Sequence, residues 1–377
     1  MATVVPFVPP PYPYERLDAL KIVAGALPGG VVDCSIGTPC DPVPEIVARA
    51  AAEAATRSMG YPPSAGTAAL HEAAAGWVAR TLGVELESAN LAACIGTKEM
   101  VVSLPHFLAL RRPERDTVLY PAVAYPSYDM GATLARLRGV PVALDADWHL
   151  DIDAISAADA ERALVLWINE PGNPSSSVAD AAYLARVAEW GRAHGVVIAS
   201  DECYVEFAPR PSTILTAGFD GVLAVHSLSK RSNLAGMRVG FYAGDPALVH
   251  YLVETRKHAG FMVPTPAQAA AVAAFGDDDH VEVQRKRYAD RRALAIDRLA
   301  AAGLHHVGGE MLFYLWLRDD AGGDGWAIAD RLARVGLLVS PGDLYGDAGA
   351  PYARLALVQP RERLEPVLDR LVKGTSE

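Results

Sequence analysis

Lys230 is the residue of this sequence whose position is hardest to explain without chemistry. It follows the apolar run Val222–His226 after a short Ser-Leu-Ser turn, and apolar runs of this length are typical of buried strands. A lysine amine has a pKa of about 10.4, and burying its charge without a partner is costly. An amine at the mouth of a sheet is useful as a nucleophile that forms a Schiff base with a cofactor. Taken alone, however, Lys230 is also consistent with a surface lysine.

Three other polar residues follow neighbouring apolar runs. Val196–Ser200 ends at Asp201, with Tyr204 three residues further on, and Ala163–Ile168 is followed closely by Asn173. A buried carboxylate needs a cationic partner, and a protonated pyridine nitrogen would be one that also makes the ring an electron sink. The phenol of Tyr204 and the amide of Asn173 could hydrogen-bond an oxygen of the same ring. Together with the lysine, the three indicate a pyridine-type cofactor far more strongly than any of them alone.

A phosphate group on such a cofactor would also find partners. Gly96, Thr97 and Lys98 form a turn that follows another apolar run and opens a helix, whose first N–H groups bind anions. Ser227 and Arg238, on either side of the lysine, could add a hydroxyl group and a charge-assisted hydrogen bond.

Up to about residue 275, short apolar runs alternate along the chain with segments that are expected to be helices, and these elements must position the groups named above. This pattern predicts a mostly parallel sheet covered on both faces, and such sheets bind ligands at the carboxyl ends of their strands. A long charged helix over Val281–Ala302 and later strands predict a smaller α+β domain. We expect an N-terminal arm and part of the small domain over residues 1–40, a large cofactor-binding domain over 41–275 and a small C-terminal domain over 276–377.

The composition excludes several other classes of protein. The 377 residues carry 34 Lys and Arg against 45 Asp and Glu, and a net charge of −11 argues against a nucleic-acid surface. No run approaches the roughly 18 apolar residues of a membrane-spanning helix, and the first residues lack the cationic region of a signal peptide. The four cysteines show neither metal-binding nor disulfide spacing. We therefore expect a cytoplasmic protein without a bound metal.

The motifs together resemble those of the class I/II aminotransferases, enzymes of fold type I that depend on pyridoxal 5′-phosphate. The resemblance covers essentially the whole chain, and its motifs are Asn169-x-Pro171-x-Asn173-Pro174, Asp201-x-x-Tyr204, Ser227-x-Ser229-Lys230 and Arg238. It implies that Lys230 is the Schiff-base lysine and general base. It implies further that Asp201 pairs with the pyridine nitrogen, while Asn173 and Tyr204 hold the 3-oxygen of the ring.

The resemblance also implies roles for residues outside these motifs. Tyr125 would stack on the cofactor ring, and Arg354 would bind the α-carboxylate of the substrate, with Gly37 and Asn173 beside it. Tyr61 resembles the tyrosine that reaches the cofactor phosphate of a neighbouring subunit. The resemblance therefore implies a homodimer with shared active sites, which acts on amino acids and oxo acids.

A finer resemblance concerns the substrate. The motifs at residues 35–39, 61–67, 95–99 and 256–264 look like those of actinobacterial N-succinyldiaminopimelate aminotransferases. Those enzymes exchange an amino group between glutamate and N-succinyl-2-amino-6-oxopimelate in lysine and diaminopimelate biosynthesis. Lys98, Arg256 and Lys257 are candidates to bind the distal carboxylate or the succinyl group, although each could instead be solvated or belong to an ion pair.

Two other functions remain open from the sequence. A C–S lyase that uses the same cofactor would share the core residues and differ only in the substrate pocket. A non-catalytic sensor of aminotransferase type is the other alternative, and the intact Lys230 argues against it.

Overall fold

The computed structural model describes residues 7–57 and 60–374, and its largest feature is a seven-stranded sheet. The strands are β2 (Leu91–Cys94), β3 (Thr117–Pro121), β4 (Arg138–Val142), β5 (Ala163–Asn169), β6 (Val197–Asp201), β7 (Val222–Ser227) and β8 (Gly240–Gly244). Their order across the sheet is β2-β8-β7-β6-β5-β3-β4. All run in the same direction except β8, which is antiparallel to both of its neighbours.

Helices cover both faces of this sheet, which explains why its central strands are continuous apolar runs. All seven residues of β5 are buried, and successive side chains face opposite layers. Trp167 packs with residues of α4 (Thr97–Arg111), α5 (Ser127–Leu134) and α9 (Pro246–His258). Ile168 packs with residues of α3 (Ala68–Leu82), α7 (Ala181–His194) and α10 (Thr265–Phe275), and α2 (Glu45–Ala55) lies against α10.

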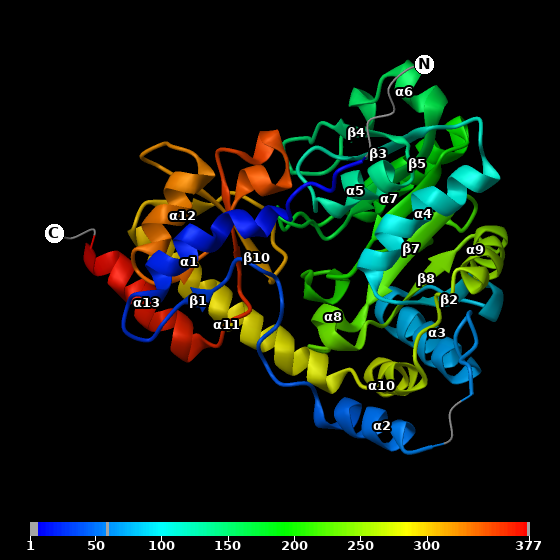
Figure 1. Cartoon of the computed structure of the whole chain (residues 1–377), viewed down its shortest axis with the longest axis horizontal. Helices are drawn as coiled ribbons and strands as arrows, with labels where there is room; N and C mark the ends of the chain where they lie inside the picture. The colour runs from blue at the N-terminus through cyan, green and yellow to red at the C-terminus, as the bar shows by residue number, and fades with distance from the viewer. Residues whose placement is uncertain (1–6, 58–59, 375–377) are drawn as a thin grey trace.

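A second hydrophobic core contains residues from both ends of the chain. Helix α1 (Asp18–Gly25) packs on α12 (Gly325–Ala333), and β1 (Val32–Asp33) pairs in parallel with β11 (Leu337–Leu338). An antiparallel sheet adds β12 (Ser340–Pro341), β13 (Ala353–Ala356), β10 (Tyr314–Asp319) and β9 (Leu304–His306), beside α11 (Asp279–Ala301) and α13 (Arg361–Gly374). Figure 1 shows α1 in blue next to α12 in orange and α13 in red, away from the large sheet.

The predicted fold class is confirmed, since a mostly parallel sheet between helices is joined to a smaller α+β part. The direction of β8 is the feature that the sequence did not predict. We keep the division of the chain near residues 40 and 275 as proposed domain boundaries; the core that contains both ends of the chain also includes Val123, Tyr204 and Phe207 from the segment between them. Within the described ranges, no helix combines the length and the apolar character that crossing a membrane requires.

Candidate active site

A cavity of about 310 Å³ lies at the carboxyl ends of β5, β6 and β7, where the large sheet meets the small domain. The register of the sheet places the end of β5 beside the end of β6, with Asn169 opposite Asp201. The strand ends thus bring together side chains that are far apart in sequence. The residues with a role predicted from the sequence that line this cavity are Gly37, Thr97, Lys98, Tyr125, Asn173, Asp201, Tyr204, Ser227, Lys230, Arg238 and Arg354, and the motif residues Asn169 and Ser229 line it too.

Lys230 enters the cavity from the short helix α8 (Leu228–Arg231), which follows β7 directly. Ser227 caps this helix, because its Oγ accepts a hydrogen bond from the backbone N–H of Ser229 at 3.1 Å. The Lys230 amine donates to the carbonyl oxygen of Gly37. The pKa of Lys230 is lowered to about 8, mainly because the buried amine loses solvation in its charged form. The guanidinium groups of Arg354 and Arg238 also lower it, whereas Cys203 and Asp201 oppose the change. A substantial fraction of this amine is therefore neutral near physiological pH.

Asp201 is a buried carboxylate at the end of β6, with 5% of its surface exposed. Its Oδ2 accepts from the hydroxyl of Tyr128 at 3.1 Å, and its Oδ1 accepts from the backbone N–H of Cys203 at 3.3 Å. Burial raises the pKa of Asp201, and these hydrogen bonds oppose the rise. No cationic side chain in residues 7–57 and 60–374 forms an ion pair with it. A protonated ring nitrogen would supply the missing partner.

Arg354 lies on β13 and is 1% exposed, so its charge needs partners inside the protein. One Nη donates to the Asn173 Oδ1 at 2.9 Å, and the other donates to the carbonyl oxygen of Ser35. The guanidinium carbon lies 4.4 Å from the ring centroid of Tyr314. Its Nε has no hydrogen-bond partner in the described part of the chain. A buried guanidinium with a spare donor that lines a cavity is suited to binding a carboxylate.

Gly96 and Arg238 lie against each other at the start of α4. Gly96 is the N-cap of this helix at φ 74° and ψ 161°, and a Cβ added to it would lie 2.5 Å from an Nη of Arg238. Only glycine therefore lets the guanidinium lie over this helix end. Arg238 binds two backbone carbonyl oxygens and no carboxylate of the described residues. Gly96 itself does not line the cavity, whereas the neighbouring Thr97 does.

The charges of the cavity are unbalanced. Lys98, Lys230, Arg238 and Arg354 line it together with a single carboxylate, Asp201. None of the four cations forms an ion pair with a carboxylate in the part of the chain that the structure describes. The cavity therefore fits a ligand set with several negative charges. A phosphate at α4, a carbonyl group near Lys230, a ring nitrogen at Asp201 and a carboxylate at Arg354 would match this donor set.

Besides Gly96, three residues that the sequence singled out lie outside the cavity. Tyr61 is 97% exposed and outside the cavity. Arg256 is buried, and its two Nη atoms donate to Glu99 at 2.6 and 2.7 Å. Lys257 is exposed and pairs with a glutamate three residues earlier at 2.7 Å. Of the two readings that the sequence left open for Arg256 and Lys257, the structure agrees with membership of an ion pair, because both charges are paired and neither residue lines the cavity.

Several residues of the cavity were not predicted as site residues from the sequence. Tyr12 and Tyr14 reach it from the N-terminal segment, and the Tyr314 hydroxyl hydrogen-bonds that of Tyr204 at 2.8 Å. Tyr128 lies behind the cavity and donates to Asp201. It stands three residues after the predicted Tyr125, a spacing that in a helix places both side chains near one face. The other contacts join distant segments, so local patterns do not reveal them.

Comparisons with known proteins agree with this geometry. The family described as aminotransferase class I and II matches residues 30–371. The 4-dedimethylamino-4-oxo-anhydrotetracycline transaminase OxyQ of Streptomyces rimosus is 42% identical, over 96% of this chain and 99% of its own. The LL-diaminopimelate aminotransferase of Desulforudis audaxviator is 34% identical, over 96% and 95%. A solved structure of a probable N-succinyldiaminopimelate aminotransferase from Thermus thermophilus superposes with a TM-score of 0.87 at 30% identity, and the match covers 96% and 100% of the two chains.

The fold and the donor set of the cavity define a pyridoxal-phosphate-dependent enzyme of fold type I. The family match and these relatives narrow the class of enzyme from any pyridoxal-phosphate enzyme of this fold to the aminotransferases. The chain belongs to the class I and II aminotransferases. It is thus an aminotransferase that acts on amino acid and oxo acid substrates with pyridoxal 5′-phosphate as its cofactor, which confirms the predicted family and cofactor.

Proposed function

We propose that this aminotransferase exchanges an amino group between glutamate and an oxo acid with a second carboxylate. The candidate acceptor is N-succinyl-2-amino-6-oxopimelate, which would place the enzyme in lysine and diaminopimelate biosynthesis. The observation that carries this proposal is Lys98. Its Nζ lies 5.0 Å from the ring centroid of Tyr12 and 5.7 Å from that of Tyr125. No carboxylate of the described residues pairs with it, so a carboxylate of the substrate can.

The relatives support this substrate class. Both the LL-diaminopimelate aminotransferases and the Thermus thermophilus protein bear names that specify diaminopimelate or its N-succinyl form. Glutamate and these compounds all carry a carboxylate besides the α-carboxylate. Two separate cations, Arg354 and Lys98, would therefore bind the two ends of either substrate.

The proposed catalytic roles fall on residues of the large domain. When bound, pyridoxal 5′-phosphate supplies an aldehyde that condenses with amines and a pyridine ring that withdraws electrons. Lys230 tethers the cofactor and moves the proton from the substrate Cα, and its lowered pKa keeps a neutral base available. Asp201 holds a proton on the ring nitrogen, because a buried carboxylate is stabilised by a cation. Asn173 and Tyr204 hydrogen-bond the 3-oxygen.

The remaining assignments concern binding. Tyr125 stacks on the ring, and the phosphate is bound at the start of α4 by Gly96, Thr97 and Lys98 together with Ser227 and Arg238. Arg354 binds the α-carboxylate, with Gly37 and Asn173 beside it. These interactions fix the direction of the Cα–H bond toward the amine.

We also propose that the functional unit is a homodimer. Tyr61 is fully exposed in the single chain, which is consistent with a side chain that reaches the phosphate site of a second copy. The cytoplasmic location stays a prediction.

An absorption spectrum of the purified protein with its cofactor tests the reaction. Glutamate should bleach the visible band, and one of a panel of oxo acids should restore it. A band that glutamate leaves unchanged contradicts the proposed donor and favours the C–S lyase alternative, for which release of a keto acid and ammonia is the assay. Restoration by monocarboxylic oxo acids alone contradicts the dicarboxylic acceptor.

A pair of variants tests the role of Lys98. Lys98→Gln should raise KM for 2-oxoglutarate by about tenfold, the loss of one charge-assisted hydrogen bond, and leave KM for pyruvate within about twofold. Lys257→Gln is the matched control, because this lysine is exposed and outside the cavity. Cofactor affinity is measured separately in both variants, since Lys98 also stands at the phosphate site. Equal changes for the two oxo acids would contradict the proposal.

A second candidate acceptor follows from one relative. The name of OxyQ specifies an oxo-anhydrotetracycline, and OxyQ is 42% identical over nearly all of both chains. This acceptor therefore belongs in the panel. If this enzyme uses that acceptor, Lys98→Gln should turn it over at the same rate as the wild type.

A further inference from the structure

Outside the substrate cavity, the half-buried His149 makes a hydrogen bond with the buried Glu170, at the start of the loop that carries Asn173. Glu170 follows the end of β5 and is 5% exposed. One carboxylate oxygen accepts a hydrogen bond from Nδ1 of His149 at 2.8 Å. The other accepts from the backbone N–H of Ala179 at 3.1 Å and from the Ser177 hydroxyl at 3.3 Å. The carboxylate thus closes the loop of residues 170–179 on itself, and His149 ties it to a separate segment.

The same loop forms a wall of the active site. The backbone N–H of Asn173 donates to the Asn169 side chain at 2.9 Å, and the Asn173 Oδ1 accepts from Arg354 at 2.9 Å. The Asn173 side chain thus holds one Nη of the guanidinium, and the carbonyl oxygen of Ser35 holds the other. A shift of the loop therefore displaces one of the two groups that hold Arg354.

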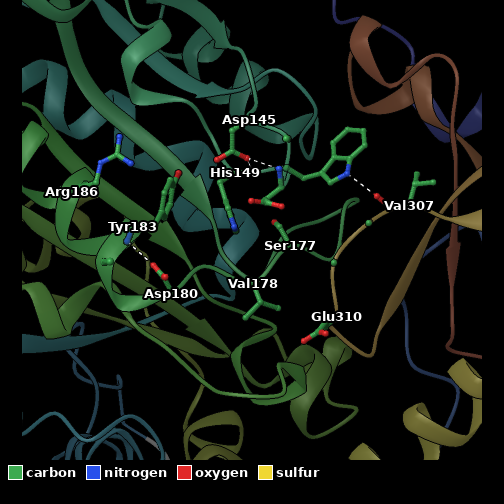
Figure 2. A pocket seen from close by; sticks show the side chains of 15 residues that line it. Asp145, His149, Ser177, Val178, Asp180, Tyr183, Arg186, Val307 and Glu310 are labelled. Carbon is green, nitrogen blue, oxygen red and sulfur yellow. Dashed lines mark hydrogen bonds between the residues drawn. The ribbon is translucent and has the colours of Figure 1, made fainter.

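The residue next to His149 is anchored in the small domain. Trp148 Nε1 donates to the carbonyl oxygen of Val307 at 2.9 Å, and its ring packs edge-on against those of Trp316 and Tyr352. Figure 2 shows this cleft, with His149 beside Tyr183 and the hydrogen bond to Val307 dashed. His149 thus contacts the loop of residues 170–179, while the preceding Trp148 contacts the small domain.

His149 can exchange protons with solvent, because it lines an open cleft of about 590 Å³. Its ring lies 4.9 Å from the ring of Tyr183 on α7. The charged groups that line the cleft around it are Asp145 and Asp147 on its own segment, Asp180 and Arg186 at α7, and Glu310 from the small domain.

The charge of His149 depends on Glu170. Burial alone would lower the pKa of His149, but the hydrogen bond and the negative charge of Glu170, with those of Asp145 and Asp147, raise it above its ordinary value. The charged pair therefore exists between the pKa of Glu170, which burial raises above its ordinary value, and the raised pKa of His149, and it is lost as the pH rises through the pKa of His149.

We propose that His149 is a positioning residue for substrate binding. In its charged form it pairs with Glu170 and holds the loop where Asn173 orients Arg354 toward the substrate carboxylate. This inference rests on the proposed role of Arg354. Lys230 and Asp201 make none of these contacts, so loss of the pair weakens substrate affinity more than turnover.

The test is the pH dependence of KM in His149→Gln, which keeps an N–H donor but no charge. KM for glutamate is measured from pH 6 to 9 and divided by the wild-type value at each pH, so that the titration of Lys230 cancels. We expect a ratio of about five at pH 6 that falls toward one as wild-type His149 loses its proton, with kcat within about twofold. His305→Gln is the matched control, since His305 is exposed and pairs with Asp320 on the surface. Its ratio should stay at one.

A second variant and a second readout complete the test. Glu170→Gln should also raise the ratio at pH 6, but its ratio should fall only in part with pH, because the carboxylate also accepts from Ala179 and Ser177 whether or not His149 is charged. Amide exchange at Ala179 should be faster than wild type at pH 6 in both variants. A ratio that is raised but constant with pH indicates packing alone and overturns the inference, as does a ratio of one at pH 6. If wild-type protein does not transaminate glutamate, the proposed function fails instead, and the exchange at Ala179 still tests whether the pair holds the loop.

Discussion

Replacing Gly96 with alanine is expected to weaken cofactor binding through a neighbouring side chain. Gly96 has φ 74° and ψ 161°, a region of backbone conformation that is almost confined to glycine. The added Cβ would lie 2.5 Å from one Nη of Arg238 and 3.0 Å from its Cζ. Because real Cβ atoms do not approach other atoms this closely, the guanidinium must leave the end of α4.

The size of the effect follows from two separate terms. The backbone strain of a non-glycine residue in this region lowers the free energy of unfolding by about 1–3 kcal/mol. Displacing Arg238 removes a charge-assisted hydrogen bond to the phosphate, which contributes about 1.5–3 kcal/mol. This second term corresponds to a rise of about ten- to hundredfold in the dissociation constant of the cofactor.

Titration of the cofactor-free protein with pyridoxal 5′-phosphate measures the dissociation constant, and urea unfolding of the same protein measures stability. Gly83→Ala is the matched control, since Gly83 ends α3 at φ 70° and no atom lies within 4 Å of an added Cβ. It should lose about 1–2 kcal/mol of stability and keep its cofactor affinity.

A double variant distinguishes displacement of Arg238 from other causes. In Arg238→Gln the shorter side chain has already lost the contact, so adding Gly96→Ala should weaken cofactor binding no further. An unchanged dissociation constant in Gly96→Ala would refute the reasoning. So would a double variant in which the two losses simply add.

Three other perturbations test separate parts of the structure. Lys230→Ala should reduce transamination of glutamate by more than about a thousandfold, because it removes the base and the tether; a loss of tenfold or less in kcat would contradict this role. The rate at which cofactor-free protein captures pyridoxal 5′-phosphate should rise through about pH 8, since burial lowers the pKa of Lys230 to that value and only the neutral amine is a nucleophile. A rate profile centred near the ordinary lysine pKa would count against it. Asp41 pairs with the buried Arg291 at 2.6 Å, so Asp41→Ala leaves that arginine without a carboxylate. Urea unfolding should then show a free energy of unfolding lower by about 3–5 kcal/mol. An unchanged midpoint would mean that the pair does not stabilise the fold.

The sequence predicts the residues whose position follows from a local pattern. Lys230 and Asp201 come directly after or near the ends of apolar runs, and parallel strands bring such ends to one edge of a sheet. The glycine turn before Thr97 predicts a helix start, which is where the structure has α4. These parts of the site needed no knowledge of distant contacts.

The unpredicted parts depend on pairs of residues that lie far apart in the sequence. Arg256 pairs with Glu99, 157 residues earlier, and nothing near either residue distinguishes such a pair from two solvated charges. The reversed direction of β8 has the same origin, because an apolar run has no direction of its own. The ion pair of His149 with Glu170 also joins two segments whose proximity only the fold determines.

The small domain has a consequence for the order in which the protein folds during synthesis. Its core joins β1 to β11, and the Ser340 hydroxyl donates to the carbonyl oxygen of Ser35, 305 residues earlier in the chain. On the ribosome, the segment around Ser35 therefore emerges long before its partners exist, while the large sheet is complete once β8 has been made. The apolar side chains of α1 must wait for α12, and Arg354 is among the last site residues to be synthesised. A nascent chain could thus fold its sheet early, yet it has no substrate site until translation is nearly finished.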